Sequence, residues 1–540
     1  MSTITAPPEV LPCESVQMPS LARLVDHPWA ALLLLPWCGF LFFYGLSAGD
    51  LYRTEALRAI VAQDFLNSGN WVVPTLYGEP LLTKPPGMYA AIAALSWPFG
   101  GVTDGSARLP SALAATATVL LFFWYFRRLF GPRGGLVAGF LVPASVMWLD
   151  KATAAEIDML QVFWVAGSVL FFLRALEAEE ANAKPQAALR WLLAALLCVA
   201  GGVLTKWTAP AFFYLTVIPL LWWRGRLRLL WARNHLLAAG LGASLCLAWA
   251  ALAVRQVGWE VLVKTVTQEA LQRLLPHEIP VAELPHHHRP YPWGEALAHP
   301  LVVFASAGPW SFFALVALWP GFAKLWDEPG RRLLQALHCW TWPNLIFWSA
   351  VPEHAPRHSF PLFPGLAGLA ALVWLAWLTG RLRWRLPRLA PAPLLVGLLA
   401  AWLVVKVGFV HAWVPIRDGR ANELLRSCGF RPKPIRDPHG KAEQIAARVP
   451  ADRPLYLFRL KDEGIMFCYG RCHADGEPER VVRRLGRPED LPSTAELVYC
   501  IVAGEEWERW EQRRPADVLL RLIDQQGDPI VLLAVRGTHE

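Results

Sequence analysis

Charged residues are scarce in this sequence of 540 residues. Asp, Glu, Lys and Arg make up 17% of it, where soluble proteins average about 25%. Apolar residues make up 55%, and the mean hydropathy is +0.32. They gather in blocks of roughly twenty residues, which is the length needed to cross a hydrocarbon core about 30 Å thick. The shortage of charge argues against a soluble enzyme and predicts a polytopic α-helical membrane protein.

Two further features are missing, a nucleic-acid-binding motif and a cysteine framework. The net charge of +8 is typical of cytoplasmic Lys and Arg in a membrane protein, so we expect no nucleic-acid partner. Of the nine cysteines, only Cys468 and Cys472 are spaced so that they could pair, if their side of the membrane is oxidising.

The apolar runs predict about eleven membrane spans, or up to about thirteen. No cleavable signal is evident in residues 1–27, which we expect to form a cytoplasmic tail. The membrane domain is expected over 28–413. The predicted spans are 28–48, 107–126, 134–150, 158–177, 189–205, 208–223, 235–255, 299–321, 332–351, 360–379 and 391–412.

Basic residues fall in alternate connections between these spans, with arginines at 127, 128 and 133 and again at 224, 226, 228 and 233. By the positive-inside rule these connections are cytoplasmic. The loop 49–106 and the turn 150–158 then face the other side, which in a bacterium is the periplasm. We therefore expect a multi-pass protein of the inner (plasma) membrane.

The first outward loop, 49–106, begins GDLYRTEALRAIVAQDFLNSGNWVVPTLYGEPLLTKPPGMY and is far longer than a connector requires. Its apolar run at 86–100 is too short to span the bilayer, and turn signals divide the rest. The loop therefore predicts helices that lie at the membrane interface. After residue 413, charged segments and short strand-like runs predict a periplasmic α/β domain over 414–540.

Acidic residues stand at the outward ends of the spans, and they are the candidates for catalysis. Asp50 and Glu55 follow the first span, and Asp158 opens the fourth. Ionisable groups at the membrane edge are functional candidates by default. The alternative for each is a solvated helix cap, for which Asp158 is well placed.

Cations are uncommon on the outward face of a membrane protein. Those expected there therefore call for a specific role. The candidates are Arg58, Lys84, Lys206, Arg273 and Arg357. Lys84 is the most specific, because Pro85-Pro86 fixes the backbone after it at the depth of lipid headgroups, where a point charge suits a lipid phosphate. Snorkelling without a ligand is the alternative.

A divalent metal remains an open question as a cofactor, with Glu156 and His288 as the candidate ligands. His288 belongs to a run of three histidines, and His-rich tracts can bind metal. Three consecutive histidines cannot all face one ion, so the signal is weak. No other cofactor is implied.

These residues together suit group transfer from a lipid phosphate. A carboxylate can take the proton of an attacking hydroxyl, and cations can stabilise the charge that builds on the leaving phosphate. A lipid-linked donor keeps its tail in the bilayer, so its reaction site must lie at the membrane boundary.

The first loop, SARLPSALAATATVLLFFWYFRRLFG and DKATAAEIDMLQ together resemble the bacterial GT-C glycosyltransferases of the aminoarabinose transferase and protein mannosyltransferase type. The resemblance is strongest over residues 45–180. It implies a multi-span domain, interfacial helices, a periplasmic α/β domain and polyprenyl-phosphate sugars as donors. Its two branches imply lipid A or protein as acceptors.

The resemblance also implies roles for particular residues. The acid of the first loop falls on Asp50, with Glu55 one helical turn on, and the carrier-phosphate lysine falls on Lys84. Here the acidic motif is one residue shorter than is usual, which leaves the choice between the two acids open. The aminoarabinose branch often has Glu where this chain has Thr83, which weakens the expectations of a metal and of lipid A as acceptor.

The sequence therefore predicts an inverting membrane glycosyltransferase that uses a polyprenyl-phosphate-linked hexose or pentose and acts on a lipid, glycan or protein acceptor. The catalytic candidates are Asp50, Glu55 and Asp158. A non-enzymatic protein that binds or transports lipid-linked glycans is the alternative. Such a transporter would carry polar residues deep within several helices, and few are present.

Overall fold

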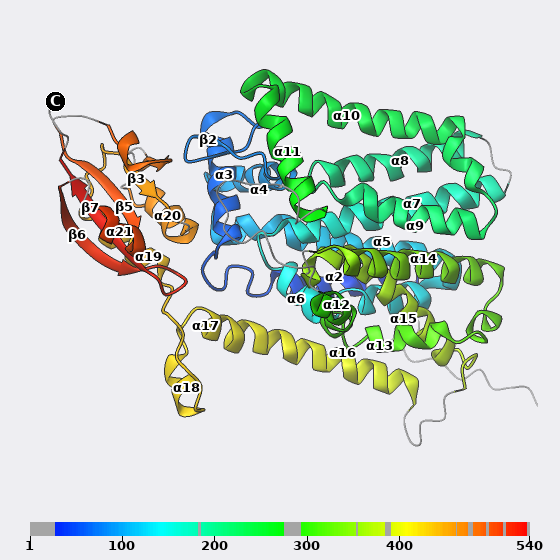
Figure 1. Ribbon diagram of the computed structural model, residues 1–540. Coiled ribbons are helices and arrows are strands. Elements are labelled where there is room, and N and C mark those ends of the chain that lie inside the picture. Colours follow the sequence, from blue (N-terminus) through cyan, green and yellow to red (C-terminus); the bar gives the residue numbers. More distant parts are fainter. Residues whose placement is uncertain are drawn as a thin grey trace, which may run out of the picture.

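The computed structural model describes most of the chain, in nine stretches. They are residues 27–181, 185–274, 293–352, 355–383, 390–460, 462–473, 479–492, 496–510 and 515–536. A bundle of long helices lies at one end of the molecule, and a twisted sheet lies at the other (Figure 1).

Six helices in the described residues are long and apolar enough to cross a membrane, and a seventh is added if a bent pair counts as one span. The six are α5 (Asp104–Leu141), α7 (Ile157–Glu180), α8 (Pro185–Val203), α10 (Arg233–Val257), α15 (Phe363–Leu378) with the 3-10 turn Pro356–Leu362 before it, and α16 (Pro391–Gly408). The expected polytopic helical fold is confirmed.

The remaining predicted spans fall on shorter or more polar helices, so the number of spans stays a prediction. These are Pro28–Leu33, α2 (Leu34–Cys38) and Gly39–Phe43 in succession, α6 (Val146–Lys151), α9 (Ala209–Trp223), α12 (Trp293–Ser306), α13 (Ser311–Ala314) and α14 (Glu328–Ala350). A further helix, α11 (Trp259–Leu274), lies between the predicted spans 235–255 and 299–321. The predicted pair 107–126 and 134–150 meets within α5 at Gly131, whose backbone is not helical (φ 72°).

Close packing in the bundle centres on α15, nearly all of whose side chains are buried. Two glycines let this helix approach α14. A Cβ added at Gly365 would lie 2.8 Å from Thr341 Oγ1, and one added at Gly368 would lie 2.7 Å from Leu337 Cδ2. Small residues at such contacts are how helices gain packing contacts in a bilayer.

The first loop folds into α3 (Thr54–Ser68), a hairpin of β1 (Thr75–Leu76) and β2 (Glu79–Pro80), and α4 (Gly87–Ser96), which ends in the 3-10 turn Trp97–Phe99. At ten residues, α4 is too short to span a bilayer, as the sequence predicts. The placement of these helices at the membrane interface stays a prediction.

The C-terminal part contains a five-stranded mixed sheet in the order β4-β3-β5-β7-β6. The strands are β3 (Leu455–Phe458), β4 (Val482–Leu485), β5 (Val498–Ala503), β6 (Ala516–Ile523) and β7 (Pro529–Val535). The helices that accompany them are α19 (Pro438–Ala446), α20 (Glu463–Gly470) and α21 (Gly504–Trp510). The predicted α/β domain is confirmed.

This sheet domain packs directly on the first loop (Figure 1). One buried apolar cluster joins Phe65 of α3 and Met88 of α4 to Ile465 of α20 and Leu457 of β3. The chain reaches the domain from α16 through α17 (Val414–Arg417) and α18 (Asn422–Ser427). The first loop is thus held between the helical bundle and the sheet domain.

Candidate active site at the first loop

A buried arginine, Arg108, organises the start of the first loop. Its Nε donates to Glu55 Oε1 at 3.0 Å, and its Nη1 donates to the carbonyls of Leu46 and Ala48, each at 3.0 Å. Glu55 Oε1 also accepts from Ala155 N at 3.0 Å. Burial acts to raise the pKa of Glu55, but the charge and hydrogen bond of Arg108, together with the Ala155 N–H and the Arg417 charge, outweigh it, and the pKa lies below its usual value.

Asp50 is held by a residue of the C-terminal linker. Arg420 Nη2 donates to both carboxylate oxygens of Asp50, each at 2.8 Å. The Asp50 side chain is 7% exposed, whereas that of Arg420 is 53% exposed. Burial raises the pKa of Asp50, although Arg420 acts against it. Asp50 is therefore a carboxylate whose partner is open to solvent.

A linker acid, Asp418, also holds the start of the first loop. Asp418 Oδ1 accepts from Arg417 Nε at 2.9 Å and from Arg436 Nη1 at 3.0 Å. Its Oδ2 accepts from Asp50 N at 3.3 Å, and Arg436 lies over the Tyr52 ring at 3.6 Å from the centroid. The linker therefore fixes the backbone on which Asp50 stands.

The turn 150–158 supplies Glu156, which joins α3 to the bundle. Arg58 Nη1 lies 2.8 Å from Glu156 Oε2, and Thr54 Oγ1 donates to Glu156 Oε1 at 2.7 Å. Both charged side chains are less than 10% exposed. Arg58, predicted to bind phosphate, and Glu156, predicted as a metal ligand, thus pair with each other.

Asp158 and Lys206 form a second buried pair, with Lys206 Nζ donating to Asp158 Oδ1 at 2.7 Å. The positive charges of Lys151 and Arg357 also act on Asp158. Arg357 itself is exposed. The sequence placed Asp158, Lys206 and Arg357 on one face without predicting this pair.

The Lys-Pro-Pro segment reaches the Lys206 turn through the backbone. Gly87 N donates to Leu204 O at 2.8 Å, and a Cβ added at Gly87 would lie 2.6 Å from that oxygen. Lys84 Nζ donates to Thr83 O at 2.8 Å. This close approach holds the Pro86–Gly87 backbone, just after Lys84, against the turn that carries Lys206.

Two of the predicted residues have side chains outside the part of the chain that the structure describes. Arg273 is on α11, but its side chain lies outside the described residues, and so does His288. Within the described stretches, no group of three His, Cys, Asp or Glu side chains is arranged to hold a metal. The metal prediction thus stays open.

Several residues of this network were missed from the sequence: Arg108, Arg417, Asp418, Arg420 and Arg436. Arg108 carried a usable signal, because an arginine inside an apolar span needs a polar partner. The linker residues carried none, because they stand in an ordinary charged segment.

Known proteins resemble this chain in sequence over part of its length. Residues 83–252 match the family model described as dolichyl-phosphate-mannose-protein mannosyltransferase. The chain is 27% identical over 336 residues to undecaprenyl phosphate-alpha-4-amino-4-deoxy-L-arabinose arabinosyl transferase 2 of Pseudomonas fluorescens, covering 62% of this chain and 54% of that protein. The corresponding transferase of Erwinia tasmaniensis is 25% identical, with 62% and 57% covered.

The solved structure of ArnT from Cupriavidus metallidurans bound to undecaprenyl phosphate superimposes with a TM-score of 0.66 and 19% identity, covering 93% of this chain and 98% of that one. The predicted resemblance to the bacterial GT-C glycosyltransferases is confirmed. At this identity the superposition establishes the fold, a helical membrane domain followed by a C-terminal sheet domain. The chain spans about half the length of the curated relatives it matches.

Proposed function

We propose that this protein is a multi-pass inner-membrane glycosyltransferase that moves one sugar from a polyprenyl-phosphate carrier to a periplasmic lipid, glycan or protein, with inversion. The matched relatives are named for transfer of an aminoarabinose from undecaprenyl phosphate. A pentosyl group is therefore our first candidate for the sugar.

One observation carries the proposal: two turns far apart in the sequence meet the first loop. The Glu55–Ala155 hydrogen bond and the Arg58–Glu156 ion pair join it to the turn 150–158. The Gly87–Leu204 hydrogen bond joins it to the turn that carries Lys206. Acids and cations of three connections that the sequence predicts to face outward thereby share one end of the helical bundle, where a lipid-linked donor would present its phosphate.

The surroundings of the two acids support Asp50 as the general base. Glu55 is enclosed by Arg108 and a backbone N–H. Both stabilise its charged form and so lower its affinity for a proton. Within the described part of the chain, the side chain seen bonded to the Asp50 carboxylate is that of Arg420, which is half exposed and so open to a substrate. The raised pKa of Asp50 also favours proton transfer from a hydroxyl.

The cations near these acids also fall into two groups, one buried and paired with carboxylates and the other more accessible. Arg58 and Lys206 are buried and each already faces a carboxylate. We therefore assign Arg58 to holding the first loop against the bundle, and Lys206 to holding the turn before α9 against α7. Lys84 and Arg420 are more accessible. We assign the carrier phosphate to Lys84, with Arg420 as the second cation that can follow the developing charge. Asp158 then acts by orienting Lys206.

The test is turnover in a defined membrane. The purified full chain is reconstituted in proteoliposomes with an undecaprenyl-phosphate-linked pentose and a bacterial envelope extract as the source of acceptor, and released undecaprenyl phosphate is measured, with Asp50→Asn as the matched inactive control. Mass spectrometry of envelope lipids, glycans and proteins, with and without the gene, identifies the acceptor. Binding of the carrier without turnover by the wild-type chain, and an unchanged envelope, would instead favour a lipid-linked-glycan binding or transport protein.

A further inference from the structure

The linker between the bundle and the sheet domain contains a short hairpin, residues 422–433, that stands apart from both. It begins with α18, and Asn422 closes it: Nδ2 donates to Lys433 O at 2.9 Å, and Oδ1 accepts from Lys433 N at 2.9 Å. All of residues 423–433 are exposed except Leu425, which is partly buried. α18 projects sideways from the end of α17, across the direction of the bundle helices (Figure 1). We call this segment the linker hairpin.

The linker hairpin starts close to the end of a candidate span. The span that contains α16 runs Pro391–Arg417, so only residues 418–421 separate it from Asn422, and a chain of this length reaches at most about 17 Å. Trp413, 49% exposed, stands near the end of the span, as aromatic residues do at a membrane interface. Lys433 Nζ lies 5.4 Å from the centroid of that ring. With α16 as a span, the base of the hairpin lies at the depth of lipid headgroups.

The charge of the linker hairpin is mostly positive. Arg426, Arg431 and Lys433 stand against one acid, Glu423. Neither arginine forms an ion pair with any residue that the structure describes. A basic residue at an anionic membrane surface strengthens binding about fivefold. The exposed arginines are therefore suited to anionic headgroups.

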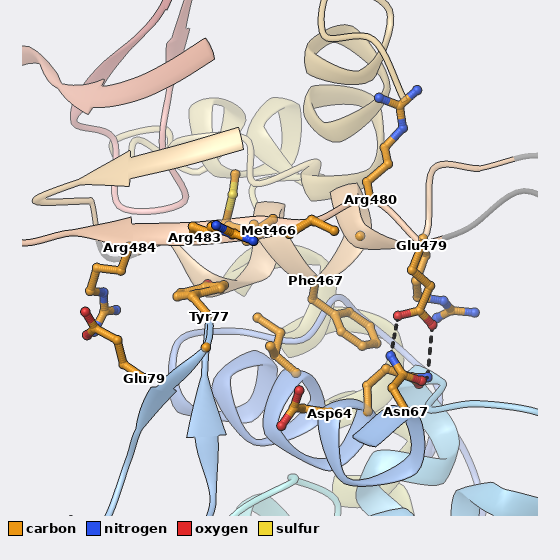
Figure 2. Close-up of a pocket in the computed structure, with 17 residues that line it drawn as sticks. Asp64, Asn67, Tyr77, Glu79, Met466, Phe467, Glu479, Arg480, Arg483 and Arg484 are labelled. Carbon is orange, nitrogen blue, oxygen red and sulfur yellow. Dashed lines mark hydrogen bonds between the residues drawn. The ribbon is translucent and has the colours of Figure 1, made fainter. Parts of the chain in front are cut away.

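Arginines of the sheet domain, by contrast, have carboxylates close by. A cavity of about 740 Å³ separates that domain from the first loop, and Arg484 lines it together with Asp64 and Glu79 of the loop. Figure 2 shows Arg484 beside Glu79, and Glu479 bonded to Asn67. Charges of both signs therefore face each other across this cavity, whereas the linker hairpin has no facing wall.

Large apolar side chains accompany the charges of the linker hairpin. Leu424 is 55% exposed and Phe430 is 66% exposed. Leaving such side chains in water is unfavourable. In segments that lie on a bilayer, Leu and Phe enter the boundary between headgroups and acyl chains while Lys and Arg meet the headgroups. The hairpin has both kinds of side chain at the depth where this can happen.

We propose that the linker hairpin binds the surface of the surrounding bilayer, with Arg426 and Arg431 on the phosphates of anionic phospholipids and Phe430 between the headgroups. These lipids act as a surface and not as substrates, so the inference does not rest on the proposed transferase activity. Arg420, two residues before the hairpin, bonds to Asp50. Lipid contact thereby holds the linker that reaches Asp50 at the membrane surface.

The test measures the membrane depth of Cys428, an exposed cysteine of the linker hairpin. The full chain is spin-labelled and placed in nanodiscs of phosphatidylcholine with or without phosphatidylglycerol. Oxygen, which concentrates in the bilayer, and a water-soluble nickel chelate then report the depth of the label. Cys428→Ser, labelled in the same way, gives the background from the other cysteines. We expect the Cys428 label to lie deeper when phosphatidylglycerol is present.

Two double variants test the charge. Arg426→Ala/Arg431→Ala should lower the ratio of membrane-bound to water-exposed label at least about tenfold in phosphatidylglycerol nanodiscs, because two cations are lost. Arg483→Ala/Arg521→Ala is the matched control, because it removes two exposed arginines from β4 and β6 of the sheet domain. It should leave the depth of the label unchanged.

Phe430→Ser tests the apolar contact without changing the charge. We expect a shallower label that still responds to phosphatidylglycerol. A label equally deep in both nanodiscs, or an unchanged depth in either Phe430→Ser or the Arg426→Ala/Arg431→Ala variant, would overturn the proposal. Spin–spin broadening in detergent, before any bilayer is added, would also overturn it and would show that the hairpin docks on a second copy of the chain.

Discussion

Arg420 donates to both carboxylate oxygens of Asp50 at 2.8 Å, across 370 residues of sequence. The linker to the sheet domain thus supplies the only side chain, in the described part of the protein, that is seen bonded to the Asp50 carboxylate. In this arrangement the proposed base is held by a partner that is itself half open to solvent.

The first prediction concerns Asp50 as the base. Asp50→Asn keeps the shape of the side chain but cannot accept a proton, so transfer from an undecaprenyl-phosphate-linked sugar should fall by about 10²-fold or more. Carrier binding should be retained. The measurement is single-turnover sugar release in proteoliposomes. Glu55→Gln is the comparison, and a variant at Asp50 that turns over at the wild-type rate would remove this residue from the mechanism.

The second prediction concerns Lys84 and the carrier phosphate. Lys84→Ala should weaken undecaprenyl phosphate binding by about ten- to a hundredfold, which is the usual effect of losing a hydrogen bond to a charged group. Lys84→Arg should restore part of it. Lys324→Ala is the matched control, because Lys324 is exposed and lies in the 3-10 turn Phe322–Leu325. Equal affinities for all four proteins would contradict the assignment.

The third prediction concerns the Glu55–Arg108 pair. Arg108→Ala would leave a buried carboxylate without its charge partner, which costs about 3–5 kcal/mol. Arg128→Ala, on the same helix, removes a more exposed pair with Glu177 and should cost at most about 1 kcal/mol. The midpoints of thermal unfolding in detergent compare the two. Similar midpoints would show that Arg108 does not stabilise the loop as its contacts indicate.

Local patterns in the sequence predicted much of this fold. The strand-like runs RPLYLFRL, AELVYCIVA and DPIVLLAV contain β3, β5 and β7. Their apolar stretches are continuous because these strands are the three inner ones of the sheet. The edge strand β4, whose sequence is VRRL, was missed because half of its residues are charged.

Part of the candidate site was also predicted from local patterns in the sequence. Asp158, Lys206, Glu55 and Arg58 were found because charges at the ends of apolar runs stand out. Their pairing was not found, because Asp158 and Lys206 are 48 residues apart and Arg58 and Glu156 are 98 apart, and no local pattern encodes which charges meet. The contacts of the linker with Asp50 depend on how the sheet domain packs, which requires the whole fold.

The last prediction concerns Asp462, which holds the backbone of Gln525, a residue of the sheet domain that contacts the first loop. Its Oδ1 accepts from Ile465 N at 3.1 Å, its Oδ2 accepts from Gln525 N at 2.7 Å, and Gln525 Nε2 donates to Leu51 O at 3.5 Å. Burial raises the pKa of Asp462 to about 6. The folded protein therefore holds a proton here that the unfolded chain releases near its ordinary pKa, about 4.

Because the folded state binds more protons between these two values, its stability should fall as the pH rises from about 4 to about 6, by about 3 kcal/mol at most. Asp462→Asn cannot ionise at this position, so its contribution to the slope should be absent in that variant, even if the variant is less stable throughout. Thermal unfolding of both proteins across this pH range measures the difference in slope. Parallel curves would mean that the Asp462 carboxyl does not titrate with folding, and that burial at this junction does not govern its protonation.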